Sequence, residues 1–131
     1  MKQTLSFSSI QSNISLVENF IDTICKLYGI NEDLYGNILI STLEAVNNAI
    51  TYGNKNNPHK QVTTEAIFEN KTLKISITDK GEGFDFNNIP DPTLSENIEK
   101  TSGRGIFLIK NLADNLEFQN NGSRLILTFI L

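Results

Sequence analysis

Apolar side chains recur at helical spacing near the start of the chain. Between residues 15 and 29 they lie three or four positions apart and form one stripe of Val17, Phe20, Ile21, Ile24, Leu27 and Tyr28. Ser12 or Ser15 can cap this helix, and Ser15 and Glu18 have the spacing of a capping box. Gly29 is expected to end the helix, because glycine readily adopts the backbone conformation that follows a last helical turn.

A second helical pattern follows directly. Asn31 is expected to cap it, because an asparagine side chain accepts a hydrogen bond from a free N–H group of the first turn. The helix should run through Ile38 and Ala49 to about Tyr52. A third, shorter helix is expected at about residues 104–114, where apolar residues again share one side.

Alternating apolar and polar residues predict five strands. They are expected at residues 2–8, 60–69, 72–79, 115–120 and 124–131. Asn70 and Lys71 form a tight turn between the second and third strands, and Asn121-Gly122 is a strong hairpin signal between the last two. The order β-α-α-β-β-α-β-β predicts an α+β fold, a two-layer α/β sandwich with a mixed, mainly antiparallel sheet and its helices on one face. We expect one domain over residues 1–131.

Residues 80–102 show no sustained periodicity and are expected to form one long loop. A loop longer than about 12–15 residues inside a compact domain is usually functional or disordered. The residues on either side of this loop are therefore the first place to look for chemistry.

Charge and composition narrow the classes of function. The 131 residues include 11 basic and 15 acidic side chains, a net charge of −4, whereas a duplex-binding surface needs concentrated Lys and Arg. We therefore expect no direct nucleic-acid binding. Cys25 is the only cysteine, which excludes an internal disulfide, and its apolar neighbours indicate a buried side chain. The N-terminus lacks a signal peptide and no stretch approaches about 18 apolar residues, so we expect a cytoplasmic protein without a membrane segment.

A first candidate site lies in the second helix. Glu44, Asn47 and Asn48 are three and four positions apart, so their side chains project from one helical face. An amide oxygen is a neutral hard ligand for Mg²⁺, and a carboxylate one turn away can orient or deprotonate a nucleophile. The arrangement suits metal-assisted phosphoryl transfer, although a solvated helix face would show the same residues.

A second candidate site follows the third strand. Asp79 continues the phase of the apolar residues before it, so its carboxylate is expected on the core side of the sheet. A carboxylate there needs a partner, and the exocyclic amine of adenine is a suitable donor. Gly81 and Gly83, with Phe84 next to them, allow a tight turn and a close approach to a flat base. An ordinary turn at the end of a strand is the alternative.

A third candidate site opens the third helix. It comprises Thr101, Ser102, Gly103, Arg104, Gly105 and Ile106. Free N–H groups and the positive end of the helix dipole attract anions, most often phosphate. Gly103 and Gly105 remove side chains that would block such an anion, and Lys100 and Arg104 add positive charge. A plain loop with a serine cap is the alternative, and the G-x-x-x-x-G-K-[ST] phosphate loop is absent from the sequence.

In their order and spacing, the three stretches resemble the motifs of the Bergerat-fold ATPase superfamily, which includes DNA gyrase B, heat-shock chaperones, mismatch-repair ATPases and sensor histidine kinases. Within it, the chain is most similar to the bacterial anti-sigma regulatory factor serine/threonine kinases. The first stretch resembles the N-box, which implies that Asn48 is the Mg²⁺ ligand, Glu44 the general base and Asn47 part of the nucleotide site. The second resembles the box whose aspartate, here Asp79, binds the adenine amine.

The remaining motifs follow the same resemblance. Residues 102–106 resemble the second glycine box, which closes over the triphosphate, and residues 90–93 resemble the ATP lid of stand-alone members. Tyr52 stands where many anti-sigma kinases have a histidine and where histidine kinases often have an aromatic residue. The resemblance to a histidine-kinase-like domain that stands alone therefore remains open beside the anti-sigma kinase.

The resemblance implies a function in transcription regulation. With ATP and Mg²⁺ as cofactors, the protein would phosphorylate a serine or threonine of an anti-sigma factor antagonist, sequester a sigma factor, and pair into a homodimer through its sheet. A length of 131 residues leaves no room for a phospho-accepting helical segment, so the acceptor is expected to be another protein. A nucleotide-dependent binding module and a simple ATPase, in which Glu44 activates water, are the alternatives.

Overall fold

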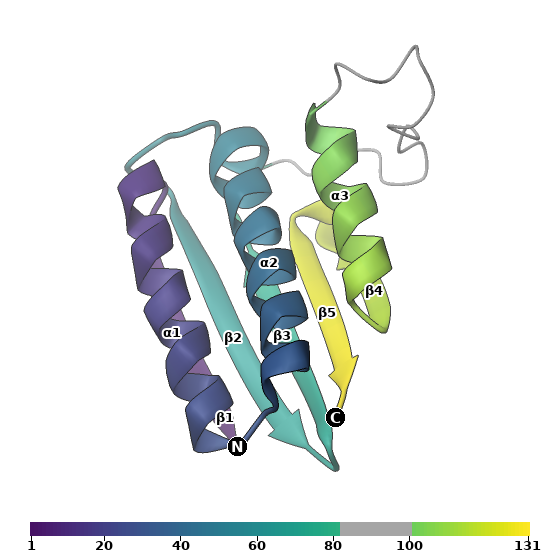
Figure 1. The fold of residues 1–131 in the computed structure, drawn as a ribbon. Helices are drawn as coiled ribbons and strands as arrows, with labels where there is room; N and C mark the ends of the chain where they lie inside the picture. The colour runs from purple at the N-terminus through teal and green to yellow at the C-terminus, as the bar shows by residue number, and fades with distance from the viewer. Residues whose placement is uncertain (82–100) are drawn as a thin grey trace.

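In the part of the chain that the structure describes, three helices cover one face of a five-stranded sheet (Figure 1). The computed structural model describes residues 1–81 and 101–131, apart from the side chains at 101–104 and 121. The elements are β1 (Lys2–Ser8), α1 (Ile14–Leu27), α2 (Glu32–Asn48), β2 (Gln61–Glu69), β3 (Thr72–Thr78), α3 (Thr101–Leu112), β4 (Asn115–Gln119) and β5 (Arg124–Ile130). The predicted element order and α+β sandwich are confirmed. None of the described helices is long and apolar enough to cross a membrane.

The strands lie in the order β1-β2-β3-β5-β4. Each neighbouring pair among the described strands is antiparallel, so this part of the chain shows none of the expected parallel pairing. Asn70 and Lys71 both have positive φ, 52° and 58°, and Glu69 pairs with Thr72. This confirms the two-residue turn, because both central residues of such a hairpin need the left-handed conformation.

The last hairpin differs from the prediction. A 3-10 turn at Asn120–Gly122 joins β4 to β5, and Gln119 pairs with Arg124. The connection therefore has four residues instead of a two-residue Asn-Gly turn. Asn120 takes a positive φ of 53° as well as Gly122, so the chain turns over a longer path.

The starts of α1 and α2 have different causes. Asn31 caps α2 as predicted, because its Oδ1 accepts a hydrogen bond from Leu34 N–H at 2.9 Å. The serine cap predicted for α1 is wrong. A 3-10 turn at Gln11–Asn13 runs into the helix, so Ser15 lies inside it and donates its hydroxyl hydrogen bond to the Ser12 carbonyl.

Helix α2 continues without a break into a π-helix, η2 (Ala49–Gly53). Asn54 N–H donates to the Ala49 carbonyl at 2.8 Å and Asn56 N–H to the Ile50 carbonyl at 2.7 Å, so the last turn is wider than an α-turn. The predicted end near Tyr52 is confirmed, but the sequence pattern did not distinguish the widened turn. π-turns of this kind are frequent at functional sites.

Helix α3 begins three residues before the predicted start, at Thr101 instead of Arg104. The prediction placed Gly103 in the loop before the helix and Gly105 at the start of the helix, and glycine is a poor helix former. Both lie inside the helix, and the contact of α3 with α2 described below overrides this local preference.

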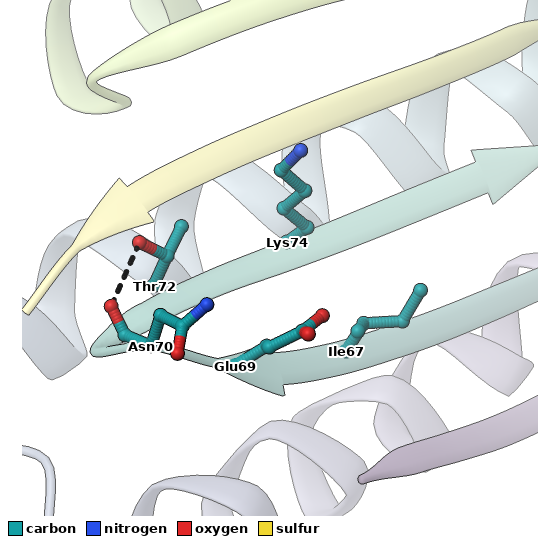
Figure 2. Close-up of a pocket in the computed structure, with 5 residues that line it drawn as sticks. All are labelled: Ile67, Glu69, Asn70, Thr72 and Lys74. Atoms are coloured by element: carbon teal, nitrogen blue, oxygen red, sulfur yellow. Dashed lines mark hydrogen bonds between the residues drawn. The ribbon is translucent and has the colours of Figure 1, made fainter.

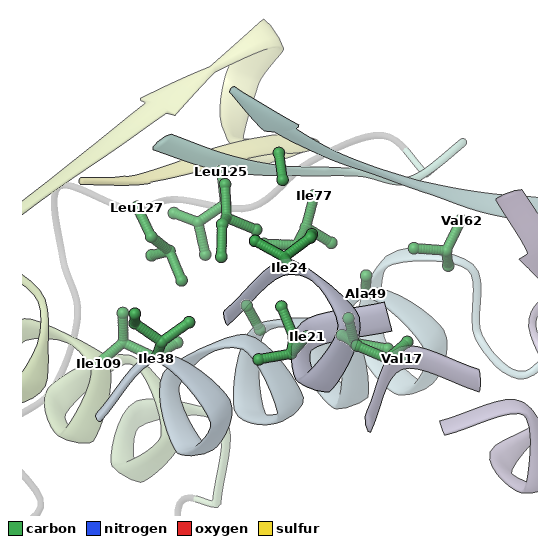
Figure 3. Close-up of a cluster of buried hydrophobic side chains, with 14 of the residues drawn as sticks. Val17, Ile21, Ile24, Ile38, Ala49, Val62, Ile77, Ile109, Leu125 and Leu127 are labelled. Atoms are coloured by element: carbon green, nitrogen blue, oxygen red, sulfur yellow. The ribbon is translucent and has the colours of Figure 1, made fainter. Parts of the chain in front are cut away.

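The core lies between the helices and the sheet (Figure 3). Its labelled side chains are Val17, Ile21 and Ile24 of α1, Ile38 of α2, Ala49 of η2, Ile109 of α3, and Val62, Ile77, Leu125 and Leu127 of the sheet. Cys25 is buried as predicted, and burial, aided by the negative charge of Asp22, raises the pKa of its thiol to about 11. This core packs α2 against β3 and β5, and α3 packs beside α2.

Candidate functional site

Glu44 and Asn48 lie one turn apart on α2, against α3. A Cβ atom added to Gly105 would lie 2.9 Å from Asn48 Nδ2 and 3.3 Å from both Asn48 Oδ1 and Glu44 Oε2. The third stretch of the sequence therefore packs directly against the first. Gly105 makes room for these two polar side chains, which a methyl group at this position would displace.

This contact changes the interpretation of the glycines in α3. Gly105 was expected to leave room for a phosphate where the loop opens into the helix. It is buried inside α3, and because the helix starts at Thr101, the free N–H groups of the first turn belong to residues 101–104. The missing side chain of Gly105 serves the contact with Asn48.

The Asn48 side chain has an unused hydrogen-bonding group. Its Nδ2 atom is buried and has no hydrogen-bond partner among the described residues. A buried amide without a partner costs free energy, so such groups usually have a ligand or a structural reason. The amide oxygen of the same group is a suitable Mg²⁺ ligand, and the residue fits the role that the sequence resemblance implies.

Asp79 directly follows β3 and its side chain lies against η2. A Cβ added to Gly53 would lie 2.3 Å from Asp79 Oδ2 and 2.4 Å from its Cγ, so the carboxylate occupies the space that a side chain at Gly53 would need. Asp79 Oδ1 accepts a hydrogen bond from Gly81 N–H at 2.7 Å. The expected core-side orientation is confirmed.

Burial sets the electrostatics of Asp79. Desolvation of the half-buried carboxylate raises its pKa, and the Gly81 N–H bond and the positive charge of Lys60 lower it by less. A ligand that donates an N–H group to this carboxylate would offset the desolvation, because it stabilises the charged form.

Gly81 is required for a different reason from the one expected. Its φ is not positive, so no left-handed turn demands a glycine here. A Cβ at Gly81 would lie 2.1 Å from the Gly53 carbonyl oxygen. The close packing of two backbones, with Gly53 on one side and Gly81 on the other, places the Asp79 turn against the end of η2.

Asn54 was not singled out from the sequence, although it is the best-bonded polar side chain near Asp79. It is 1% exposed. Its Oδ1 accepts from Lys80 N–H at 2.7 Å, and its Nδ2 donates to Ser9 Oγ at 2.7 Å and to the Gln61 carbonyl at 3.1 Å. In the sequence, Gly53-Asn54 resembles an ordinary polar helix end, so neither residue was predicted to belong to the site.

The other sequence-predicted residues divide into three groups. Asn47 is half-buried, and it is not among the closest neighbours of Gly105, which are Asn48 and Glu44. Ile106 is buried in the apolar core. Gly83, Phe84 and Lys100 lie outside the described residues, as do the expected lid at 90–93 and the side chains of Thr101, Ser102 and Arg104.

The two clusters of the candidate site, Glu44–Asn48–Gly105 and Gly53–Asp79–Gly81, are joined by one helical run. Asn48 ends α2, and Gly53 ends η2 five residues later. A shallow pocket of about 230 Å³ lies elsewhere, at the β2–β3 hairpin. It is lined by Ile67, Glu69, Asn70, Thr72 and Lys74 and contains none of the sequence-predicted site residues (Figure 2).

The chain is similar to known proteins over most of its length. The family described as a histidine kinase-like ATPase domain matches residues 7–130. An anti-sigma F factor of Oceanobacillus iheyensis is 27% identical over 118 residues, which cover 88% of this chain and 81% of that protein. An anti-sigma F factor of Bacillus cytotoxicus is 30% identical over 125 residues, with 93% and 85% covered, and one of Shouchella clausii is 30% identical over 119 residues, with 88% and 81% covered.

Proposed function

Because the chain belongs to the histidine kinase-like ATPase domain family, we propose that it is an ATP- and Mg²⁺-dependent serine/threonine protein kinase that phosphorylates an anti-sigma factor antagonist. The observation that carries the proposal is the meeting of Glu44 and Asn48 with Gly105 of α3. It supports the proposal because a carboxylate and an amide that could bind Mg²⁺ lie against α3, whose first turn has free N–H groups that could bind phosphate. The similarity to anti-sigma F factors supports the choice of partner.

Asp79 would select the adenine base. Its Oδ1 already accepts Gly81 N–H, and the second oxygen, packed over Gly53, would accept the exocyclic amine. Because burial disfavours the charged carboxylate, this donor would bring a larger gain here than at a solvated aspartate. The backbone contact between Gly53 and Gly81 keeps the carboxylate in place before nucleotide arrives.

Asn48 would hold Mg²⁺ through its amide oxygen. No cluster of three His, Cys, Asp or Glu side chains among the described residues could hold a metal by itself, so phosphate oxygens and water would complete the ligand set. When bound, the ion supplies neutralisation of the phosphate charge, which phosphoryl transfer requires.

Glu44 would act as the general base. Its carboxylate, one turn from Asn48, would accept the proton of a serine or threonine hydroxyl as that oxygen forms its bond to the γ-phosphorus. The bond between the γ-phosphorus and the bridging oxygen breaks, and the electron pair leaves with ADP. The simple ATPase uses the same base with water in place of the hydroxyl.

The kinase is tested with labelled ATP, Mg²⁺ and a small α/β antagonist protein, and phosphoserine or phosphothreonine is expected on the antagonist. Glu44→Gln should lower the rate by about 10²–10⁴-fold and leave ATP affinity unchanged, because only the proton acceptor is lost. Glu32→Gln, an exposed acid at the start of the same helix, is the matched control and should keep the full rate. An equal loss of ATP affinity in Glu44→Gln would contradict its assignment as the base, and label released only as free phosphate would favour the ATPase.

We further propose that the protein acts in the cytoplasm, binds a sigma factor and forms a homodimer. In the described residues, the sheet face opposite the helices is uncovered, and it carries partly exposed Ile67 and Ile126 among polar side chains. Light scattering should give twice the monomer mass, and a monomer mass at all concentrations would exclude the dimer.

A further inference from the structure

We infer that Asn54 is a positioning residue for nucleotide recognition: its side chain holds the turn that presents the Asp79 carboxylate. The inference rests on the proposed function, because it assumes that Asp79 receives the adenine amine. It adds Asn54, the residue that follows η2, as a side chain that acts through Asp79.

The Asn54 side chain connects three segments that are far apart in the sequence. Its Oδ1 accepts from Lys80 N–H, and its two Nδ2 hydrogens go to Ser9 Oγ and to the Gln61 carbonyl. Ser9 in turn donates its hydroxyl to the Lys60 carbonyl at 2.7 Å. The turn after β3 is thereby tied to the end of β1 and the start of β2.

These bonds fix the backbone on both sides of the Asp79 side chain. The Asp79 N–H donates to the Ser123 carbonyl at 2.9 Å, and the next N–H along the chain, that of Lys80, donates to Asn54. The Gly81 N–H then bonds to the carboxylate itself. Without Asn54, the Lys80 N–H loses its acceptor, and the turn is held only by the Asp79 N–H bond, the Gly81 N–H bond and the Gly53–Gly81 contact, so the carboxylate should be less precisely placed.

The chemistry of the site specifies asparagine. Only a side-chain amide of this length offers one acceptor and two donors in the observed places. An aspartate would keep the acceptor, lose both donors and add a negative charge beside a carboxylate that burial already disfavours. A glutamine has one more methylene, and because Asn54 is only 1% exposed there is little room for it.

The readout is the ratio of ATP affinity to inosine triphosphate affinity, measured by calorimetry. Inosine triphosphate has a carbonyl oxygen in place of the exocyclic amine, so a site with a placed carboxylate rejects it. The wild type should prefer ATP by about tenfold or more. Asn54→Ala should bring this ratio close to one, whereas a variant that is only less stable would lose affinity for both nucleotides equally.

Two variants complete the experiment. Ser9→Ala is the matched control, because it removes a buried partner of the same network but leaves the Asn54–Lys80 bond, and its nucleotide preference should stay unchanged. Asp79→Asn should abolish the preference directly. Hydrogen exchange of the Lys80 amide should accelerate in Asn54→Ala and not in Ser9→Ala.

The outcomes separate the inference from its premise. If Asp79→Asn keeps the wild-type preference for ATP, the proposed role of Asp79 is wrong. If Asp79→Asn loses the preference but folded Asn54→Ala keeps it, Asn54 is a structural residue only and the inference is overturned. Equal loss of preference in Ser9→Ala and Asn54→Ala would also overturn it, because the bond to Lys80 would then not be the cause.

Discussion

The charged form of the Asp79 side chain suits ligand binding, but burial makes that form unfavourable for the stability of the protein. Burial against Gly53 raises the pKa of its carboxyl, so between the ordinary value of 3.8 and the raised value the folded protein binds more protons than the unfolded chain. The stability that comes from the protonated form is present at low pH and is lost as pH rises through the folded-state pKa. Above the folded-state pKa, the desolvated charge of Asp79 therefore lowers the stability of the folded protein.

Replacing this carboxylate should stabilise the protein. Asp79→Asn keeps an oxygen that can accept Gly81 N–H and removes the desolvated charge, so its free energy of unfolding should exceed that of the wild type at about pH 7. The difference should shrink as pH falls to about 3, where the wild-type carboxyl is protonated as well. Urea unfolding at both pH values measures it, and a variant less stable at neutral pH would contradict the direction.

At the level of secondary structure, the candidate site lies mainly on two helices, α2 with its continuation η2, and α3. The run of α2 and η2 carries Glu44 and Asn48, and then Gly53 and Asn54, toward the turn after β3. Helix α3 contacts the first pair through Gly105. In Figure 1, the C-terminal end of α2 and the N-terminal end of α3 lie at the same end of the molecule. The geometry of the site thus depends on how closely these two helices approach.

A single methyl group tests this approach. Gly105→Ala should leave stability unchanged or raise it by up to about 1 kcal/mol, because alanine is the better helix former and the three atoms nearest the new Cβ are side-chain ends of Asn48 and Glu44 that can shift. Displacing these ends should weaken Mg²⁺-dependent ATP binding by about tenfold or more. Calorimetry with and without Mg²⁺ and urea unfolding measure the two effects.

Gly36→Ala is the matched control for the helix effect. It lies in α2, and nothing stands within 4 Å of a Cβ at this position. It should raise stability by a similar amount and leave ATP binding intact. If both glycine variants bind ATP as the wild type does, the α2–α3 contact does not define the site.

At the scale of the whole molecule, the apolar layer between helices and sheet supplies the stability on which the site depends. Leu127 is fully buried in β5, which pairs with both β3 and β4, and it faces the helices in the core. Ile130 ends the same strand and is 66% exposed. Stability should therefore respond very differently to truncation at these two positions.

Leu127→Ala should lower the free energy of unfolding by about 2–5 kcal/mol, because it removes buried methyl groups and leaves a cavity. Ile130→Ala should change it by about 0.5 kcal/mol or less. Both variants should keep the ATP preference of the wild type at a temperature where they are folded. A loss of that preference in folded Leu127→Ala would show that core packing also tunes the site.

Local sequence patterns predicted most helices, strands and turns well, because these elements depend mainly on residues that are neighbours along the chain. The Asn31 cap, the Asn70-Lys71 turn and the alternation of β3 are all set within a few residues. The predicted serine cap was wrong because a 3-10 turn at Gln11–Asn13 runs into α1 and leaves Ser15 inside the helix. The predicted start of the third helix was wrong because α3 packs on α2, a contact between distant segments that leaves no local signature.

For the site, the sequence by itself determined which residue types could do phosphoryl chemistry and in what order they occur: Glu44 and Asn48 on one helical face, then Asp79 at a strand end. Their mutual placement was decided only by the tertiary structure. The Asp79 carboxylate packs against Gly53, and the Asn48 amide packs against Gly105. The Lys80 N–H bonds to the side chain of Asn54. Such contacts join positions about 25 to 60 residues apart, and hydrophobic periodicity carries no information about which of two distant backbones will approach closely.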